Sequence, residues 1–435
     1  MLILGGGYAG LAAARVFGKY PKTLSRAGLA PVVVDRVEHH VYTPLLYEVA
    51  SGCVGAHGAA AGLELAQGVS LHFDRVLQDC CRVGYIHGEI SGIDVAQRIV
   101  TLQNGTRLPY AYLLLALGSE TDYYGIPGLQ HHAYALKTRA QALLIRQRIQ
   151  EFIDRKQRRE EVQIQIMVGG GGATGVEFSA EMASCFRRLV REGKLADGDW
   201  SLTLVEASPR LLGMLAPEVS AHALARLTSL GVKVLRDTCI KRADHGGVVL
   251  APRPLKPGEP AESLVCDFRT EVEKVFEADV LVWTGGVRAP DITKSLGLPL
   301  DPKGRLLVDP TFAVPGAKGL YAVGDVSSLT DPATKRAVPQ LAQAAIEEAE
   351  LAARNILAAM QGRSGKNYHH HSFPASIPLG GKNAVTVFAN GVVVRGFVGW
   401  LIRQLADLRY FMRVFPFGLA LRFFFSGTRA YLHND

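Results

Sequence analysis

The chain opens on the stretch Leu2-Ile3-Leu4-Gly5-Gly6-Gly7-Tyr8-Ala9-Gly10, and the helical pattern of residues 11–17 follows directly. An apolar strand, a GxGxxG turn and a helix in this order are typical of a dinucleotide-binding turn. Gly5 would make the tight turn, Gly7 would let the backbone approach a pyrophosphate, and Gly10 would let the helix pack closely on the strand. The start of the helix would then offer unpaired N–H groups to the phosphates.

The same pattern occurs a second time. Residues 163–168 are predicted to form a strand, and Gly170, Gly172 and Gly175 repeat the GxGxxG spacing before a helix expected over residues 176–189. One such motif is a weak signal, but two complete copies in one chain are far more specific. The duplication suggests that one copy serves a flavin and the other a nicotinamide.

Each glycine motif is followed by an apolar strand that ends in an acid. Residues 31–34 end in Asp35, and residues 202–205 end in Glu206. An acid at this position binds the ribose 2′-hydroxyl and would repel a 2′-phosphate. The second copy is therefore predicted to prefer NADH over NADPH.

Three further apolar strands end in glycine, and they lie within residues 112–118, 279–286 and 319–325. The first two fall where a chain would leave and re-enter a first nucleotide domain around an inserted second one. We therefore predict an α/β fold with two Rossmann-like dinucleotide-binding domains, the second inserted in the first. The expected boundaries are 1–118 and 287–365 for the first domain, 119–286 for the second, and 366–435 for a C-terminal segment.

Composition limits the remaining choices. The 435 residues are 48% hydrophobic and 20% charged, with a net charge of +8, which are values of a globular and basic protein. The charge permits nucleic acid, anionic lipid or a phosphate-bearing cofactor as a partner, but no segment interleaves aromatic and basic residues, so we do not expect nucleic acid. No signal peptide and no run of 18 uncharged apolar residues are visible, so a spanning helix is not expected. Six cysteines without a CxxC spacing predict reduced thiols and argue against a metal site or a redox dithiol.

The C-terminal segment combines a predicted hairpin with an amphipathic helix. Asn390-Gly391 is expected to form a two-residue turn between two apolar strands. After Gly396, apolar residues recur at helical spacing, while Arg403, Gln404 and Asp407 lie off that stripe. The stripe consists of Phe397, Trp400, Leu401, Leu405, Leu408, Phe411, Met412 and Phe415. A stripe of this kind with neighbouring arginines is typical of a helix that lies in the surface of an anionic membrane. A helix packed on the first domain, or a homodimer interface, would give the same pattern.

Taken together, the residues resemble type II NADH dehydrogenases, the single-chain NADH:quinone oxidoreductases among the two-dinucleotide-binding-domain flavoproteins. The most specific stretches are residues 42–52 (YTPLLYEVASG), Val176-Glu177, and residues 283–289 (WTGGVRA). Gly324-Asp325 resembles the segment that holds the FAD ribityl and pyrophosphate. Residues 342–345 (AQAA) resemble the stretch between isoalloxazine and quinone. Disulfide reductases and sulfide:quinone reductases are disfavoured, because the cysteines that their chemistry needs are missing from the expected places.

The resemblance implies non-covalent FAD, NADH as electron donor and a membrane quinone as acceptor. It implies a peripheral enzyme on the cytoplasmic face of the cell membrane, and without a spanning helix we expect no proton pumping. Glu177 is the candidate for handling a proton at the nicotinamide–flavin junction, and Gln343 is the expected quinone neighbour. The residues expected to bind the two cofactors are Gly5, Gly7, Tyr8, Ala9, Gly10, Asp35, Arg36, Pro44, Leu45, Gly118, Gly170, Gly172, Ala173, Thr174, Gly175, Glu177, Glu206, Gly285, Gly286, Gly324, Asp325, Ala342 and Gln343.

One departure from the family pattern leaves the acceptor open. The pattern AQxAxQ has Glu347 in place of its second glutamine. A carboxylate accepts hydrogen bonds and donates one only when protonated, so Glu347 would act on a quinone as a proton donor or not at all. The alternatives are a soluble NAD(P)H-dependent flavin reductase that serves an iron–sulfur protein, a reductase of a naphthoquinone precursor, and a non-enzymatic NADH sensor.

Overall fold

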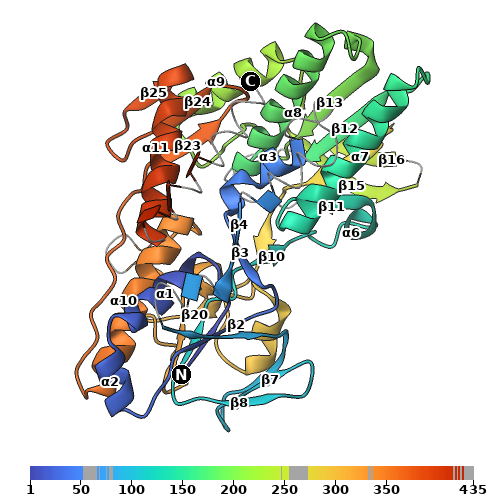
Figure 1. Cartoon of the computed structure of the whole chain (residues 1–435). Helices are drawn as coiled ribbons and strands as arrows, with labels where there is room; N and C mark the ends of the chain where they lie inside the picture. The colour runs from blue at the N-terminus through green and yellow to red at the C-terminus, as the bar shows by residue number, and fades with distance from the viewer. Residues whose placement is uncertain are drawn as a thin grey trace.

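The computed structural model describes residues 1–51, 66–67, 69–74, 76–77, 82–245, 247–253, 273–331, 335, 337–414, 417–418, 420–421 and 424–425. Two five-stranded parallel sheets form its frame, one in the lower and one in the upper half of Figure 1. Because both faces of such sheets are covered by helices or loops, several of their strands are apolar and buried along their whole length.

The first sheet has the strand order β21-β9-β1-β2-β5. Its strands are β1 (Leu2–Leu4), β2 (Val32–Asp35), β5 (Gly84–His87), β9 (Leu113–Leu115) and β21 (Leu320–Ala322). The neighbour of β9 on its outer side is therefore contributed by a segment that lies some two hundred residues further along the chain. Helix α1 (Tyr8–Gly18) follows β1 and packs against α10 (Ala342–Met360).

The second sheet has the order β11-β18-β12-β13-β14, and all of its strands come from between β9 and β21. They are β11 (Ala133–Ala135), β12 (Ile164–Gly169), β13 (Trp200–Val205), β14 (Lys233–Leu235) and β18 (Val280–Trp283). The segment that forms the second sheet is thus inserted, in sequence, between two strands of the first sheet. The short antiparallel pair β10 (Glu120–Thr121) and β19 (Val287–Arg288) joins the outgoing and returning segments.

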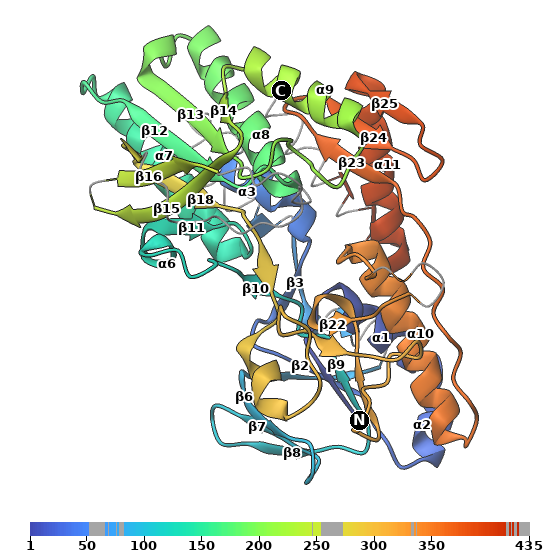
Figure 2. The same cartoon turned by 180° about the vertical axis from the view of Figure 1, so that it is seen from behind.

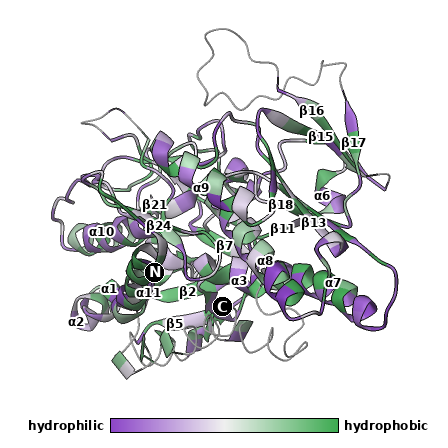
Figure 3. Ribbon diagram, turned by 90° about the horizontal axis from the view of Figure 1, so that it is seen from above, coloured by the Kyte–Doolittle hydropathy of each residue, from purple (hydrophilic) through white to green (hydrophobic). Residues whose placement is uncertain are grey.

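Helices flank the second sheet. Helix α7 (Arg139–Gln157) begins at Thr138, whose side chain accepts from the Gln141 N–H in a capping box. Hydrophilic residues alternate with hydrophobic ones along it (Figure 3). Helix α8 (Ala173–Arg191) begins three residues before the predicted start, because residues 173–175 of the glycine motif are already helical. Helix α9 (Pro217–Ser229) lies beside α8.

Shorter elements complete the two halves. Helix α2 (Pro21–Arg26) lies beside α1, α3 (Leu46–Ser51) packs against α7 and α8, and α6 (Leu129–His132) contacts the strands β11 and β15. The small sheets are β3 (His39–Val41) with β4 (Ser70–His72), β6 (Ile90–Asp94) with β7 (Ile99–Leu102) and β8 (Arg107–Pro109), β15 (Thr238–Asp244) with β16 (Gly247–Pro252) and β17 (Lys274–Phe276), and β20 (Leu306–Leu307) with β22 (Ser327–Ser328). Cys239 on β15 is disulfide-bonded, whereas the sequence predicted reduced cysteines. Contacts made only in the folded chain, not sequence spacing, decide such a pairing.

The C-terminal segment forms an antiparallel sheet and a helix. The predicted hairpin is β24 (Ala384–Val387) and β25 (Val393–Arg395), and β23 (Ala375–Pro378) adds a strand that the sequence did not predict. The two-residue turn is wrong: Phe388 N–H donates to the Val392 carbonyl and leaves three residues in the loop. Only Gly391 among these three has positive φ, whereas the predicted turn would need it at Asn390 also.

Helix α11 (Gly396–Val414) follows β25 and packs against this small sheet. Figures 1 and 2 agree that α10 and α11 follow one another along one side of the molecule, from the first sheet to the level of the second. Phe415 and Pro416, at the predicted end of the helix, lie outside the described residues. In the part of the chain that the structure describes, no helix combines the length and the apolar character that crossing a membrane requires.

Candidate functional site

The first glycine turn has the geometry that its sequence predicts. Gly5 has a φ of +99°, and a Cβ on Gly10 would lie 1.8 Å from the Gly5 carbonyl oxygen. A Cβ on Gly7 would meet nothing within 4 Å, so the backbone at that point is open. Gly7 caps α1 without any side-chain hydrogen bond, which leaves the first N–H groups of the helix available to an anion.

The carboxylate of Asp35 holds this turn from the neighbouring strand. It accepts from Gly6 N–H at 2.6 Å through one oxygen and from Val37 N–H at 3.0 Å through the other. Each oxygen keeps a second lone pair, so the carboxylate can still accept from a ribose hydroxyl. The neighbouring Arg36 is exposed, and its carbonyl is hydrogen-bonded to His87.

The second glycine turn repeats this arrangement. Gly170 has a φ of +106°, a Cβ on Gly175 would lie 1.9 Å from the Gly170 carbonyl oxygen, and Gly172 is open. Gly171 N–H donates to Glu206 at 2.6 Å, and Ser208 N–H donates to the other carboxylate oxygen at 2.6 Å. Ala173 and Thr174 begin α8, and neither side chain caps the helix. Both turns therefore fit the pyrophosphate and ribose of a dinucleotide.

Gly285 and Gly286 lie against the second turn. A Cβ on Gly170 would approach Gly285 Cα to 2.7 Å, so these two backbones cross with no room for a side chain. A Cβ on Gly286 would meet the hydroxyl of Tyr124 at 2.2 Å. The predicted strand-to-glycine segment thus forms the wall of the second turn.

Gly118, Asp325 and Lys137 meet where the first sheet leads into the second. Ser119 Oγ donates to Asp325 at 2.6 Å, and Lys137 Nζ donates to Ser119 Oγ at 2.6 Å and lies 3.9 Å from the Asp325 carboxylate. Burial lowers the pKa of Lys137, and Asp325 opposes that shift. The group places a cation and a carboxylate on Ser119, the residue after Gly118.

Glu348 supports the Gly324-Asp325 segment from α10. Its carboxylate accepts from Gly324 N–H at 2.7 Å. Burial raises the pKa of Glu348 to about 7, the Gly324 hydrogen bond opposes the rise, and Asp325 and Glu347 add to it. Its neighbour Glu347, expected from the sequence as a proton donor to the quinone, is half-buried and lies 3.6 Å from His371. At the start of the same helix, Ala342 is half-buried and Gln343 is exposed.

A cluster of aromatic side chains ties the first turn to α11. His40 is 3% exposed, and its ring hydrogen-bonds the Gly6 carbonyl at 3.2 Å and the Tyr410 hydroxyl at 2.8 Å. Tyr42 stacks on Tyr410 with the ring centroids 4.8 Å apart, and Tyr8 contacts both rings. Burial lowers the pKa of His40 to about 4, so its ring is neutral at neutral pH.

The polar face of α11 points into the molecule. Arg403 and Asp407 form a buried ion pair, Asp407 also accepts from the Tyr42 hydroxyl at 2.5 Å, and Arg403 reaches the Pro44 carbonyl at 3.5 Å. Leu45, beside Pro44, is buried. From its place beside the apolar stripe, Arg403 was expected to meet a lipid headgroup. Because it is buried in this ion pair, it is not available to one. The pairing of the two opposite charges, with the Tyr42 hydrogen bond to the same carboxylate oxygen, allows these charges to be buried.

The apolar stripe of α11 is mostly exposed. Leu405 is 55% exposed and Leu401 45%, and Phe397 and Met412 are similarly open. Phe411 is an exception, because it turns inward onto Tyr42. Packing of the stripe against the first domain, the alternative left open by the sequence, does not occur for these four exposed residues. A helix with its polar face inside and its apolar face outside presents an unusual surface to water.

Glu177 lies on α8, two residues after the last glycine of the second turn. Its side chain is half-buried, and desolvation raises the pKa of Glu177 to about 8, against the opposing charge of Arg403. The carboxyl group is therefore mostly protonated at neutral pH and can donate a proton or a hydrogen bond. Glu181, one turn further, accepts from Gly381 N–H at 3.3 Å, which is a packing role.

Sequence reasoning missed Lys137, Glu348, His40 and Tyr410. Each makes its contact to an element at least eighteen residues away, so no local spacing marks it. The pair His39-His40 before the YTPLL stretch was the one available signal, because a histidine inside an apolar run must find partners.

Comparisons with known proteins agree with this geometry. The family model described as pyridine nucleotide-disulphide oxidoreductase matches residues 1–349. A relative named type II NADH:quinone oxidoreductase from Haemophilus influenzae is 28% identical over 90% of this chain and 87% of its own. One of the same name from Staphylococcus saprophyticus is 24% identical over 97% of both chains. The solved structure of NDH2 from Plasmodium falciparum in complex with NADH superposes with a TM-score of 0.81 at 16% identity, over 98% of this chain and 97% of that one.

Proposed function

Because the chain belongs to the pyridine nucleotide-disulphide oxidoreductase family, we propose that it is a type II NADH:quinone oxidoreductase that does not pump protons. It would bind FAD non-covalently at the first glycine turn and NADH at the second. The observation that carries this proposal is the pair of matched turns, each with an open glycine and a carboxylate that accepts two backbone N–H groups. The curated relatives named above carry the same activity in their names.

The residues divide between the two cofactors. The first turn, Asp35, Gly118 and Gly324-Asp325 would hold FAD, and the second turn with Glu206 and Gly285-Gly286 would hold NADH. When bound, FAD would accept a hydride from NADH and pass two electrons to the quinone. Lys137 and Asp325 would fix the orientation of the flavin edge that faces them, because their hydrogen-bond chain through Ser119 is already formed. The predicted domain ranges are part of this proposal: 1–118 and 287–365 would form the FAD domain, 119–286 the NADH domain and 366–435 the C-terminal segment.

Glu177 would hold the proton that the reaction needs near the junction of the two sites. Its carboxyl is protonated at neutral pH because burial outweighs the charge of Arg403. Gln343, at the start of α10, would contact the quinone, and Glu347 one turn later would face the same acceptor or act as a second proton donor. Which quinone is used, and whether NADPH serves as a slower donor, are outcomes of the measurements below.

The exposed stripe of α11 would bring the protein to its acceptor. Phe397, Leu401 and Leu405 would enter the boundary of the acyl chains, which would make the enzyme a peripheral protein on the cytoplasmic face of the cell membrane. Anionic lipid would add to the attraction because the whole chain carries a net charge of +8. A homodimer through the same stripe is the competing occupant.

Rapid mixing tests the activity. FAD-loaded protein should lose its flavin absorbance on mixing with NADH and recover it on mixing with a short-chain quinone. Loss without recovery would point to an iron–sulfur protein as acceptor, and slow loss without turnover would point to a sensor. Faster recovery with a naphthoquinone precursor than with ubiquinone or menaquinone analogues would identify the third alternative.

Vesicle flotation tests the membrane surface. The variant Leu401→Ser/Leu405→Ser should bind vesicles of phosphatidylglycerol at least tenfold more weakly than the wild type, since about 1 kcal/mol or more is lost with each buried leucine. Leu144→Ser/Val275→Ser removes two equally exposed apolar side chains from the second sheet region and should bind like the wild type. Equal binding by both variants, with a change in oligomeric state for the first, would assign the stripe to a dimer.

A further inference from the structure

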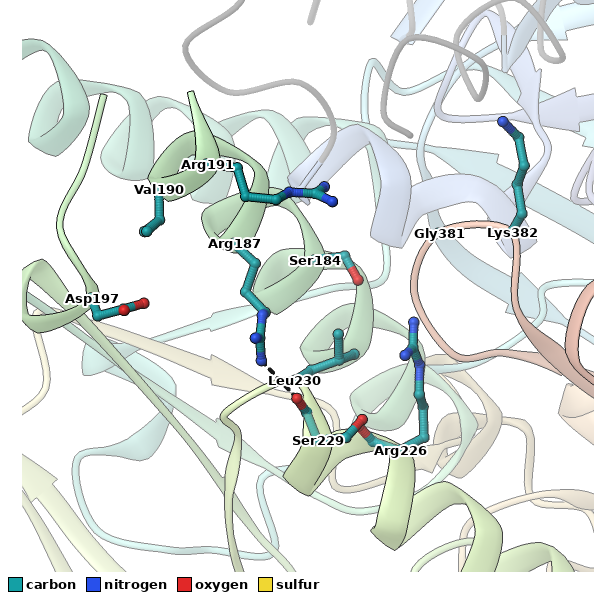
Figure 4. Close-up of a pocket in the computed structure, with 10 residues that line it drawn as sticks. All are labelled: Ser184, Arg187, Val190, Arg191, Asp197, Arg226, Ser229, Leu230, Gly381 and Lys382. Atoms are coloured by element: carbon teal, nitrogen blue, oxygen red, sulfur yellow. Dashed lines mark hydrogen bonds between the residues drawn. The ribbon is translucent and has the colours of Figure 1, made fainter. Parts of the chain in front are cut away.

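A cavity that is separate from both glycine turns lies between α8, α9 and the turn that joins β23 to β24. Its volume is about 730 Å³, and its basic side chains are Arg187 and Arg191 from α8, Arg226 from α9 and Lys382 from the turn. Figure 4 shows these four side chains around one space. The cavity lies at the far end of α8, about 20 Å from the second glycine turn at 1.5 Å per residue.

The wall of this cavity is firmly built. Arg226 donates to the carbonyls of Leu379 and Gly380 at 3.1 and 3.2 Å, and so fixes the β23–β24 turn to α9. Gly380 has a φ of +79°, and a Cβ there would lie 2.3 Å from the Ser184 hydroxyl on α8. Only glycine therefore allows the turn to come this close. The cavity is a product of tertiary packing and not of a loose surface loop.

The cavity has an excess of positive charge. Four cations and one carboxylate, Asp197, line it. Arg187, Arg191 and Arg226 form no ion pair with any carboxylate among the residues that the structure describes. The pKa of Arg226 is lowered by burial and then by the charge of Arg187. Like charges held together in this way are stabilised by an anion that lies between them.

The donors that remain fit a tetrahedral oxyanion. Arg187 uses one nitrogen on the Ser229 carbonyl at 2.6 Å, and Arg226 uses two on the turn, so both keep N–H groups for another acceptor. They come from different elements, α8 and α9, and both side chains line the cavity. Inorganic phosphate and phosphate monoesters offer at least three terminal oxygens and close to two negative charges, and a phosphodiester headgroup offers two terminal oxygens and one charge, all in tetrahedral geometry, whereas a carboxylate offers two oxygens in one plane.

We propose that this cavity is a binding site for a phosphate group, separate from the cofactor sites. The phosphate could belong to a soluble ester or to the headgroup of an anionic phospholipid, because the β23–β24 turn belongs to the small sheet on which α11 packs. The proposal goes beyond the proposed function and does not depend on it.

Calorimetric titration with inorganic phosphate tests the site. The protein would carry FAD and saturating NAD⁺, so that both glycine turns are occupied, with chloride keeping the ionic strength constant. Arg191→Gln/Lys382→Gln removes two exposed charges of the cavity, and Lys274→Gln/Lys303→Gln removes two exposed charges elsewhere. We expect the first variant to bind phosphate about tenfold more weakly than the wild type, and the second to bind like the wild type. Equal affinity of the two variants would overturn the proposal.

Vesicles then separate the two sources of the phosphate. If the cavity variant also binds phosphatidylglycerol vesicles more weakly than the control variant, while both bind phosphatidylcholine vesicles equally, the ligand is a lipid headgroup. If the two variants bind both kinds of vesicle equally while inorganic phosphate still distinguishes them, the ligand is a soluble phosphate ester.

Discussion

The two glycine turns make nearly the same local hydrogen bonds, and they differ in the residues that bind them from other parts of the chain. In both, the residue after the first glycine of the motif, Gly6 or Gly171, donates its N–H to an acid at 2.6 Å, and the last glycine leaves no room for a Cβ. In the second turn, Thr284 Oγ1 donates to the carbonyls of Gly169 and Gly170, each at 3.0 Å. Thr284 directly follows β18, a strand of the sheet that carries this turn. In the first turn, the Gly6 carbonyl is bound by His40, and His40 in turn is bound by Tyr410 of α11.

This difference separates a self-contained site from one that depends on a distant segment. The second turn is complete within residues that fold as one sheet. The first turn is completed by a helix that begins more than three hundred and fifty residues later and exposes its apolar face. Any movement of α11 on binding to a surface is therefore expected to disturb the hydrogen bonds that hold the first turn and not those that hold the second.

The largest expected effect comes from filling the tight point of each turn. Gly10→Ala places a methyl group 1.8 Å from the Gly5 oxygen, and Gly175→Ala places one 1.9 Å from the Gly170 oxygen. Overpacking of this kind costs about 3 kcal/mol, so each variant should bind its own cofactor about a hundredfold more weakly. Flavin retention and NADH titration measure the two affinities separately. If each substitution weakened both affinities equally, the two turns would not be independent.

Gly7→Ala and Gly172→Ala provide the matched controls. A Cβ at either position meets nothing within 4 Å, so the free energy of unfolding of the cofactor-free protein should stay unchanged. Cofactor affinity should still fall, because the methyl group occupies the space where the backbone is open to a pyrophosphate.

The next effect is a pH dependence present on one side of the comparison. Two residues after the last glycine, the first copy has the buried Ala12 and the second has Glu177. The pKa of Glu177 is about 8 in the folded protein against an ordinary value of 4.5. Between these values the folded state keeps a proton that the unfolded state has lost, so stability falls as pH rises through this window.

Urea unfolding from pH 5 to pH 8 measures this pH dependence. The stability of Glu177→Gln should exceed that of the wild type increasingly with pH, by on the order of 2 kcal/mol at pH 8, after a discount for the partial exposure of the side chain. Ala12→Gly, which lowers stability without changing any charge, should run parallel to the wild type. Parallel curves for Glu177→Gln as well would mean that the carboxyl is ionised throughout.

A smaller effect tests the outside support of each turn. Tyr410→Phe removes the hydroxyl that His40 binds at 2.8 Å and should weaken FAD binding about fivefold, since an unpaired buried group costs about 1 kcal/mol or more. NADH binding should not change. Thr284→Val removes the hydroxyl that holds the second turn, so it should weaken NADH binding and leave FAD binding unchanged. Weakening of NADH binding by Tyr410→Phe would show that α11 supports both turns, and would remove the distinction.

What the sequence could predict follows the same division. Gly5, Gly10, Gly170 and Gly175 act through residues next to them, so their spacing predicted both turns and the acids that hold them. The exposed stripe of α11 was also readable, because helical periodicity is local. The inward turn of Phe411 and the burial of Arg403 with Asp407 were not, since they depend on Tyr42 and on packing between segments far apart in the chain. For the same reason the sequence did not point to Glu348, whose partner is the Gly324 N–H on a different element.

The smallest effect concerns the two acids themselves. Both oxygens of Asp35 and of Glu206 accept from N–H groups, so an amide would set a donor against a donor in either turn. Asp35→Asn should therefore lower the affinity for FAD, and Glu206→Gln should lower the affinity for NADH. Only Glu206→Gln also removes a charge that repels a 2′-phosphate, so NADPH should gain on NADH as donor by about threefold, because exposed charges repel weakly. Steady-state rates with the two donors measure this ratio. An unchanged ratio would mean that the second turn selects its donor by shape, and the two acids would then be equivalent supports of the backbone.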